Sequence, residues 1–101
     1  MRILEIRSCV LAEKYEISLH AQKERYQEDV DLNEIEEALI HGEIIEDYPD
    51  DPRGPSCLVL GNARGKAIHI VCSILNNGWL RIITVYIPRI PKWINPRQRS
   101  R

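Results

Sequence analysis

The spacing of apolar residues changes once along this chain, at Gly42. Before Gly42 they recur at helical intervals, as at Ile3, Ile6 and Val10, and after it they alternate with polar residues as in a half-buried strand. A chain of 101 residues forms one domain around a single core. The pattern therefore predicts an α+β fold, in which N-terminal helices pack on one face of a small antiparallel sheet of about four strands.

Three helices are predicted, over residues 3–13, 20–27 and 32–41, with a short extended segment at 15–19. The third helix has the clearest start, because Asp31 and Glu34 have capping-box spacing and Val30 and Ile35 have the spacing of a hydrophobic staple. Gly42 is expected to end this helix in the left-handed conformation.

Four strands are predicted, over residues 43–48, 56–61, 67–74 and 79–87. A Pro- and Asp-rich loop separates the first two, and Asn77-Gly78 indicates a tight hairpin between the last two. In the third strand Ile68 and Ile70 should face one side and His69 the other. In the last strand Leu80, Ile82, Thr84 and Tyr86 are expected to share one face. We expect residues 1–94 to form the domain and the basic residues 95–101 to be a disordered tail.

Charge is strongly segregated, although the net charge is only −1. All fifteen acidic residues lie at or before Asp51, where only five bases occur, which gives −10 for residues 1–51. The nine bases after Asp51 are accompanied by no acid, which gives +9. An acidic side and a basic side are therefore expected, and the basic side would attract nucleic acid or an acidic protein. In the alternative, the basic half is attracted only to the acidic half of its own chain.

Several classes of protein are disfavoured by the sequence. No stretch approaches the roughly 18 apolar residues that span a bilayer, and charges within the first seven residues argue against a signal peptide. The three cysteines have no CxxC spacing and are typical of reduced thiols. The three histidines are too scattered for a metal motif, and no phosphate-binding glycine loop is present. We therefore expect a cytoplasmic protein without membrane association, metal site or cofactor.

His20 and Arg25, in the segment SLHAQKER, are the first candidates for chemistry. A histidine at a helix N-terminus is kept neutral by the helix dipole and can act as a general base, although it can equally be an N-cap or packing residue. The guanidinium of Arg25 can hold a phosphate, or it can pair with the acidic half of the chain. The two residues do not share a face of one helix.

The C-terminal half supplies further candidates. Thr84 and Tyr86 can mark a site at the rim of the sheet, and whether Arg81 and His69 join them depends on strand register. Trp93, beside Lys92, can stack on a nucleic-acid base or can anchor the C-terminus to the core.

Several segments together resemble one family of small bacterial proteins, the domain of unknown function 4258. They are SLHAQKER, ALIHGEIIEDYPDD, PSCLVLG, the strand that contains His69, and TVY with its following proline and KW, and they cover about residues 17–93. The resemblance implies a RelE-like toxin fold, often encoded beside a zinc-finger or helix-turn-helix antitoxin. His20 and Arg25 match the family's helix motif, and Thr84 and Tyr86 its final-strand motif, without a catalytic assignment. Arg89 departs from the pattern, since relatives tend to have an acidic residue after the proline.

By this resemblance we expect the toxin component of a bacterial toxin–antitoxin pair, acting as a metal-independent endoribonuclease on mRNA, free or on the ribosome. The catalytic candidates are His20, Arg25, His69 and Tyr86, and the RNA-binding candidates are Arg81, Thr84, Arg89, Lys92 and Trp93. His20 or His69 would be the base, Arg25 or Arg81 the cation at the phosphate, and Tyr86 a donor at the leaving group. The alternative is a non-catalytic binding module whose basic C-terminal half engages a protein partner or nucleic acid. Convergence of the four catalytic candidates in one cleft would favour catalysis.

Overall fold

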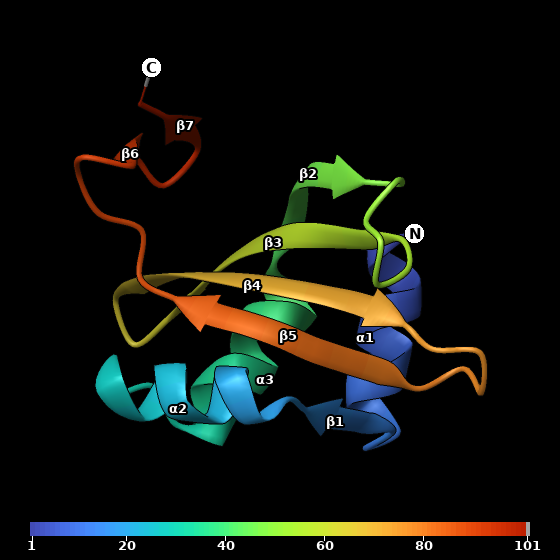
Figure 1. Cartoon of the computed structure of the whole chain (residues 1–101). Coiled ribbons are helices and arrows are strands. Elements are labelled where there is room, and N and C mark those ends of the chain that lie inside the picture. Colours follow the sequence, from blue (N-terminus) through green and yellow to red (C-terminus); the bar gives the residue numbers. More distant parts are fainter. Residues whose placement is uncertain (101) are drawn as a thin grey trace.

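Helices and strands form separate layers in the computed structural model of the chain, which describes residues 1–100 (Figure 1). The three helices are α1 (Ile3–Leu11), α2 (Leu19–Gln27) and α3 (Leu32–His41). The strands are β1 (Tyr15–Ile17), β2 (Glu43–Tyr48), β3 (Ser56–Ala63), β4 (Lys66–Ile74), β5 (Leu80–Tyr86), β6 (Trp93–Asn95) and β7 (Gln98–Arg99). The fold is therefore α+β, as the change of period at Gly42 predicts. Within residues 1–100, no helix is long and apolar enough to cross a membrane.

The main sheet has five strands in the order β1-β5-β4-β3-β2. Strands β2 to β5 form the expected antiparallel meander, but the sheet is mixed because β1 pairs with β5 in parallel. The expected extended segment at 15–19 thus becomes a fifth strand. Its backbone groups satisfy part of the edge of β5, which would otherwise be unpaired.

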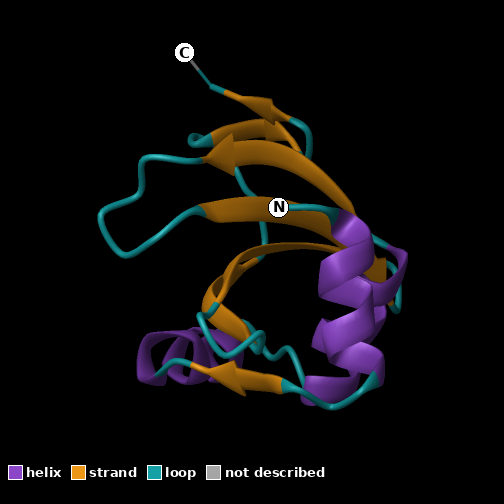
Figure 2. Cartoon of the chain, turned by 90° about the vertical axis from the view of Figure 1, so that its right-hand side faces the viewer, coloured by secondary structure: helices purple, strands orange, loops and turns teal. Residues whose placement is uncertain are grey.

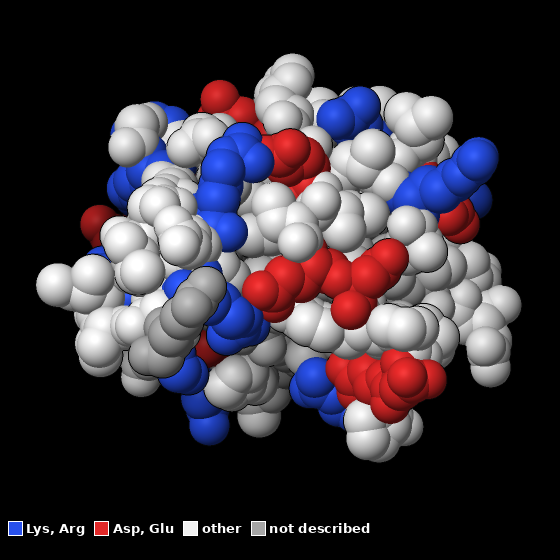
Figure 3. Space-filling view, turned by 90° about the horizontal axis from the view of Figure 1, so that it is seen from above, with Lys and Arg blue, Asp and Glu red and all other residues white. Residues whose placement is uncertain are grey.

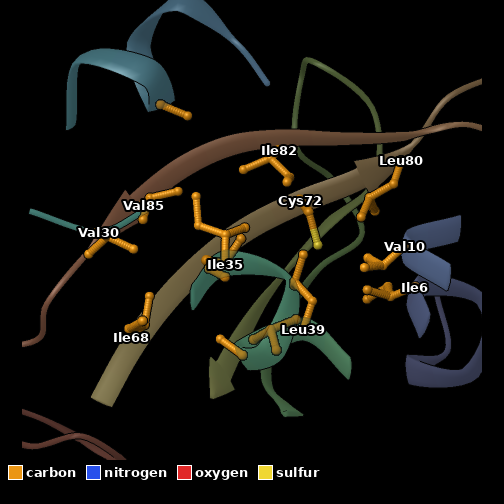
Figure 4. Packing of buried hydrophobic residues seen from close by; sticks show 14 of the residues in the cluster. Ile6, Val10, Val30, Ile35, Leu39, Ile68, Cys72, Leu80, Ile82 and Val85 are labelled. Carbon is orange, nitrogen blue, oxygen red and sulfur yellow. The ribbon is translucent and has the colours of Figure 1, made fainter. Parts of the chain in front are cut away.

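The core lies between one face of the sheet and helices α1 and α3, while α2 runs along the β5 edge (Figures 1 and 2). Ile35 and Leu39 of α3 and Ile6 of α1 are fully buried against the sheet (Figure 4). The strands contribute Ile68, Ile70, Cys72, Leu80, Ile82 and Val85 to the same cluster. Cys57 and Cys72 are buried free thiols and Cys9 is a partly exposed one.

Helices α2 and α3 are each capped at their N-terminus by a side chain. Asp31 accepts from the backbone N–H of Glu34 at 2.8 Å, and the Glu34 carboxylate accepts from that of Asp31 at 3.0 Å, which confirms the capping box. The Ser18 hydroxyl caps α2 by accepting from the backbone N–H of Ala21 at 3.0 Å. Gly42 ends α3 in an extended conformation, with φ −84°. The prediction that it adopts the left-handed conformation was therefore wrong. Glycine is needed there because a Cβ would overlap the carbonyl oxygens of α3 and β3.

A β-bulge in β5 reverses which face its side chains occupy. The pairing with β4 shifts between Val71 and Cys72, so that Thr84 lies opposite Val71 and Ile82 opposite Cys72, with one extra residue between them. The expectation that Leu80, Ile82, Thr84 and Tyr86 share a face was therefore wrong. Leu80 and Ile82 face the core, whereas Thr84 and Tyr86 lie on the opposite face with His69, as bulges beside functional sites often re-aim side chains.

The last residues form a small hairpin of β6 and β7 where a disordered tail was expected. Trp93 is only 2% exposed, and its burial anchors the hairpin on the face opposite α1 and α3. Ion pairs of Arg97 with Glu43 and of Arg99 with Glu46 attach it to β2. The ordered segment thus reaches at least residue 100, and Arg101 lies outside the described residues.

The expected acidic and basic sides do not form. Seven of the nine bases after Asp51 pair with acids at or before it: Arg53 with Asp51, Arg64 with Asp31, Lys66 with Glu34, Arg81 with Glu16, Arg89 with Glu28, Arg97 with Glu43 and Arg99 with Glu46. On the face shown in Figure 3, acidic and basic side chains consequently lie among one another. The two halves of the chain neutralise each other, which is the alternative that the sequence left open.

Candidate functional site

A hollow of about 440 Å³ lies where α2, the end of β5 and the C-terminal hairpin meet. We call it the His20 pocket. Its lining residues come from three elements: His20 and Glu24, then Thr84 and Tyr86, then Lys92, Trp93 and Arg99. Five of these, all but Glu24 and Arg99, were expected site residues. The bulge in β5 is the reason that Thr84 and Tyr86 open into this pocket rather than into the core.

Glu24 lies beside His20 at the mouth of the pocket. One carboxylate oxygen of Glu24 accepts the backbone N–H of Val85 at 3.0 Å and lies 3.2 Å from His20 Nε2. His20 itself is exposed, with 67% of its side-chain surface accessible. Because Ser18 is the N-cap, His20 does not serve that structural role. A carboxylate beside an imidazole is a common arrangement for a general base.

Glu24 was absent from the residues expected in the site. The sequence does carry a signal for it, since His20 and Glu24 are four residues apart and such pairs meet on one helix face. The contact from Glu24 to β5 has no sequence signal, because it depends on where β1 stops pairing. Beyond Ile17, side chains at α2 bond to the backbone along the edge of β5. The Ser18 hydroxyl donates to the Ile83 carbonyl, and the Glu24 carboxylate accepts from the Val85 N–H.

His69 lies beneath the pocket and is fully buried. Its Nε2 is 2.7 Å from the Pro96 carbonyl oxygen, and its Nδ1 is 3.1 Å from the Tyr86 hydroxyl. Since a carbonyl only accepts, Nε2 carries the proton and Tyr86 donates to Nδ1. Burial lowers the pKa of His69, which keeps the ring neutral. Both ring nitrogens are therefore occupied, and His69 cannot take a proton from a substrate while the hairpin is in place.

Tyr86 connects the buried histidine to the pocket. Burial raises the pKa of its phenol above the ordinary value, while Trp93 and Arg99 oppose that rise. Its ring meets His69 edge-on, with 5.1 Å between centroids. The phenol remains protonated near neutral pH and can donate either to His69 or to a group in the pocket.

Two cations border the pocket, and only one of them is paired. Arg99 donates to both carboxylate oxygens of Glu46 at 2.8 and 2.9 Å and lies 4.6 Å above the Trp93 ring. This hydrogen bonding from Arg99 lowers the pKa of Glu46. Lys92 has no acidic partner anywhere in residues 1–100. It is therefore the basic group in the pocket that is most available to an anionic ligand.

Trp93 serves as an anchor. It is 2% exposed, packs edge-on against His69 with 4.4 Å between centroids, and lies under Arg99. An indole buried in this way has no free face for a nucleic-acid base, so the stacking expectation for Trp93 is not supported by its position.

The remaining expected residues lie outside the pocket. Arg25 donates to Gln22 at 2.5 Å and to the Val30 carbonyl at 3.4 Å, which fixes the end of α2. Arg81 pairs with Glu16 at 2.6 Å. Arg89 pairs with Glu28 at 2.7 Å. Of the four catalytic candidates, His20 and Tyr86 thus share the pocket, His69 is sealed beneath it and Arg25 is elsewhere.

No group of three His, Cys, Asp or Glu side chains in the described part of the chain is placed to hold a metal ion. The His20 pocket instead combines an imidazole beside a carboxylate, a phenol and an ammonium group. These are the groups of acid–base and electrostatic chemistry on an anionic substrate.

The fold and pocket define a small α+β protein with a site between a helix and the edge of a bulged strand. Residues 17–87 match the family model described as domain of unknown function (DUF4258), and the chain belongs to that family. No curated protein and no solved structure gives a significant match. The matched region contains His20, Glu24, Thr84 and Tyr86, whereas the hairpin residues of the pocket lie beyond it.

Proposed function

We propose that this protein is a metal-independent endoribonuclease that cleaves mRNA at the His20 pocket. The observation that carries the proposal is the pairing of His20 with Glu24 in a pocket that also contains Tyr86 and Lys92. Cleavage of RNA through its 2′-hydroxyl needs a base, an acid and positive charge, and these side chains supply all three.

In the proposed reaction, His20 accepts the proton of the ribose 2′-hydroxyl, whose oxygen attacks the adjacent phosphorus. The bond from phosphorus to the 5′-oxygen breaks, and that oxygen takes a proton from Tyr86. The products are a 2′,3′-cyclic phosphate end and a 5′-hydroxyl end. Glu24 stabilises the imidazolium that forms on His20. Tyr86 must exchange its hydrogen bond to His69 for one to the leaving oxygen.

Lys92 is the proposed partner of the negative charge that develops on the phosphate, since no carboxylate in residues 1–100 competes for it. Arg99 adds positive charge at the rim but remains bonded to Glu46. Arg89 is held by Glu28 and therefore has a smaller role than the sequence suggested.

We further propose that the protein acts in the cytoplasm as the toxin component of a bacterial toxin–antitoxin pair. The chain belongs to the DUF4258 family, whose description names no function. The resemblance of that family to RelE-like toxins, noted from the sequence, is the support for this assignment. An antitoxin of the zinc-finger or helix-turn-helix type is the expected protein partner, and RNA, free or on the ribosome, is the expected substrate.

The test is an RNA cleavage assay in excess EDTA, with and without ribosomes, on wild type, His20→Ala and Lys92→Ala. Arg64→Ala is the matched control, because Arg64 is an exposed, paired arginine on the turn between β3 and β4. We expect cyclic phosphate ends from wild type and the control, and a loss of at least ~10²-fold in His20→Ala. Cleavage by folded His20→Ala at the wild-type rate would refute the proposed mechanism.

A non-catalytic binding module is the second candidate. The observation in its favour is that two of the four catalytic candidates, Arg25 and His69, form hydrogen bonds within the fold. The pairing of the basic half with the acidic half favours a protein partner over nucleic acid for such a module. Wild-type protein that cleaves no RNA under any of these conditions, yet forms a stable complex with a protein encoded beside it, would support it.

A further inference from the structure

A second, smaller hollow of about 220 Å³ also borders His20. We call it the Ser73 pocket. It lies over the opposite end of β5 from Tyr86, and its walls include Ser73, Leu75, Ile83, Arg81 and Arg53. Because His20 lines both hollows, a ligand chain that crosses His20 would extend from one pocket into the other.

The base of the Ser73 pocket is rigid, since it is built on paired strands. Ser73 of β4 lies directly opposite Arg81 of β5, and Arg81 lies opposite Glu16 of β1. These residues stand on the sheet face opposite α1 and α3, together with Ile83. Ser73 is 5% exposed and Ile83 is 7% exposed, so the two side chains form a floor rather than a rim.

The polar groups around this floor have unused hydrogen-bonding capacity. The Ser73 hydroxyl has no hydrogen-bond partner among residues 1–100, although it lines the pocket. Arg81 uses a single guanidinium nitrogen for its bond to Glu16. Arg53 is fixed at the rim by two bonds from its guanidinium to Asp51, at 3.0 and 3.2 Å, which leave its third nitrogen free.

The walls combine apolar surface with directed donors. Leu75 and Ile83 offer apolar contact, Ser73 offers one hydroxyl, and Arg81 and Arg53 offer positive charge. A free phosphate would gain nothing from the apolar floor, and an apolar ligand would gain nothing from the arginines. A nucleotide has both parts, namely a flat base with a polar edge and a phosphate, and arginine can contact either of them.

We propose that the Ser73 pocket binds the nucleotide next to the scissile phosphate of the RNA substrate. The base lies against Leu75 and Ile83 with its polar edge at the Ser73 hydroxyl, and its phosphate contacts Arg81 and Arg53. This inference rests on the proposed ribonuclease function, because it places the scissile phosphate at His20. It adds a subsite that makes the enzyme read at least one base beside the cut.

The test is a titration of the full chain with uridine 3′-monophosphate and adenosine 3′-monophosphate, followed by the backbone amide signals in NMR. Ribose 5-phosphate and inorganic phosphate are the control ligands, because they carry a phosphate but no nucleobase. We expect the nucleotides to shift the signals of Ser73, Leu75 and Arg81 and to bind more tightly than the two base-free ligands. Ser73→Ala should weaken nucleotide binding by roughly 2- to 10-fold, the range of one neutral hydrogen bond.

Arg81→Gln provides a second variant, in case Ser73→Ala disturbs the sheet, and Arg64→Ala is again the matched control. Arg81→Gln should weaken the nucleotides and both base-free phosphates, whereas the control should bind like wild type. Inorganic phosphate binding as tightly as the nucleotides, or shifts confined to residues around Tyr86 and Lys92, would overturn the subsite and leave the ribonuclease proposal standing. Nucleotide binding at Ser73 without cleavage of any RNA would support the pocket and contradict the ribonuclease.

Discussion

His69 Nε2 donates to the carbonyl oxygen of Pro96 at 2.7 Å, and this bond joins the middle of β4 to the C-terminal hairpin. Trp93 packs on the same imidazole, so the hairpin closes over a neutral, fully buried histidine. Together with the ion pairs to β2, this contact beneath the pocket places Lys92 and Arg99 of the His20 pocket.

Stability should depend on pH through His69. Burial lowers the pKa of this histidine in the folded state, so below its ordinary value of about 6.5 the unfolded chain binds a proton that the folded chain does not. The free energy of unfolding should consequently decrease as the pH falls from 7 toward 5. The measurement is urea unfolding of wild type and His69→Gln across this range.

The variant has no titrating ring at position 69, so the stability difference between the two proteins should shrink as the pH falls. His20 and His41 are present in both proteins and cancel in the comparison. A difference in the free energy of unfolding between the two proteins that stays constant from pH 7 to pH 5 would contradict a buried neutral His69.

Glu24 should act on cleavage through His20. In Glu24→Gln the amide oxygen can still accept the Val85 N–H, but it cannot stabilise a protonated His20. We expect the cleavage rate to fall by roughly tenfold with little loss of stability, and the effect to disappear when His20 is already alanine, because residues in contact are not additive. Rates of the two single variants and the double variant, with thermal unfolding as the control, test this. If Glu24→Gln lowers the cleavage rate by the same factor with and without His20, Glu24 does not act through His20.

Gly61→Ala should destabilise the fold. A Cβ at this position of β3 would overlap the backbone of α3 at Ala38, and neither element can move without disturbing the core. We expect a loss of roughly 1–3 kcal/mol, as for other overpacked sites, measured by chemical denaturation. Asn62→Ala is the matched control, since Asn62 is the next residue of β3 and is exposed. Wild-type stability of Gly61→Ala would mean that α3 does not approach the strand this closely.

Ser18→Ala should loosen α2 from the sheet. Ser18 caps the helix and also donates to the Ile83 carbonyl at 2.9 Å, so the substitution removes two bonds at once. The expected loss of stability is about 1–2 kcal/mol, the upper half of the range for N-caps. Amide exchange should also become faster in the first turn of α2. Ser8→Ala in α1, where the serine is exposed, should leave both quantities near their wild-type values.

Local sequence patterns were enough to predict the helices, the strands of the meander and the capping box at Asp31. They also predicted that His69 faces away from Ile68 and Ile70. These features depend on the periodicity and caps of neighbouring residues, and neighbouring residues are what a sequence displays. The family motif similarly pointed to His20 and Tyr86, which share the pocket.

Tertiary structure decided the features that combine distant segments. The bulge in β5 placed Thr84 and Tyr86 on the same face as His69. Because β1 pairs with β5 only as far as Ile82, the N–H of Val85 was left for Glu24 to accept. Arg25, in the same motif as His20, became a helix-end contact, and the basic half of the chain found its partners in the acidic half. Strand register, bulge position and ion pairing are chosen by packing between residues far apart in the chain, and such packing leaves no local pattern to read. The sequence by itself thus determined the helices, the strands of the meander and several site residues, and only the folded chain decided which of them meet.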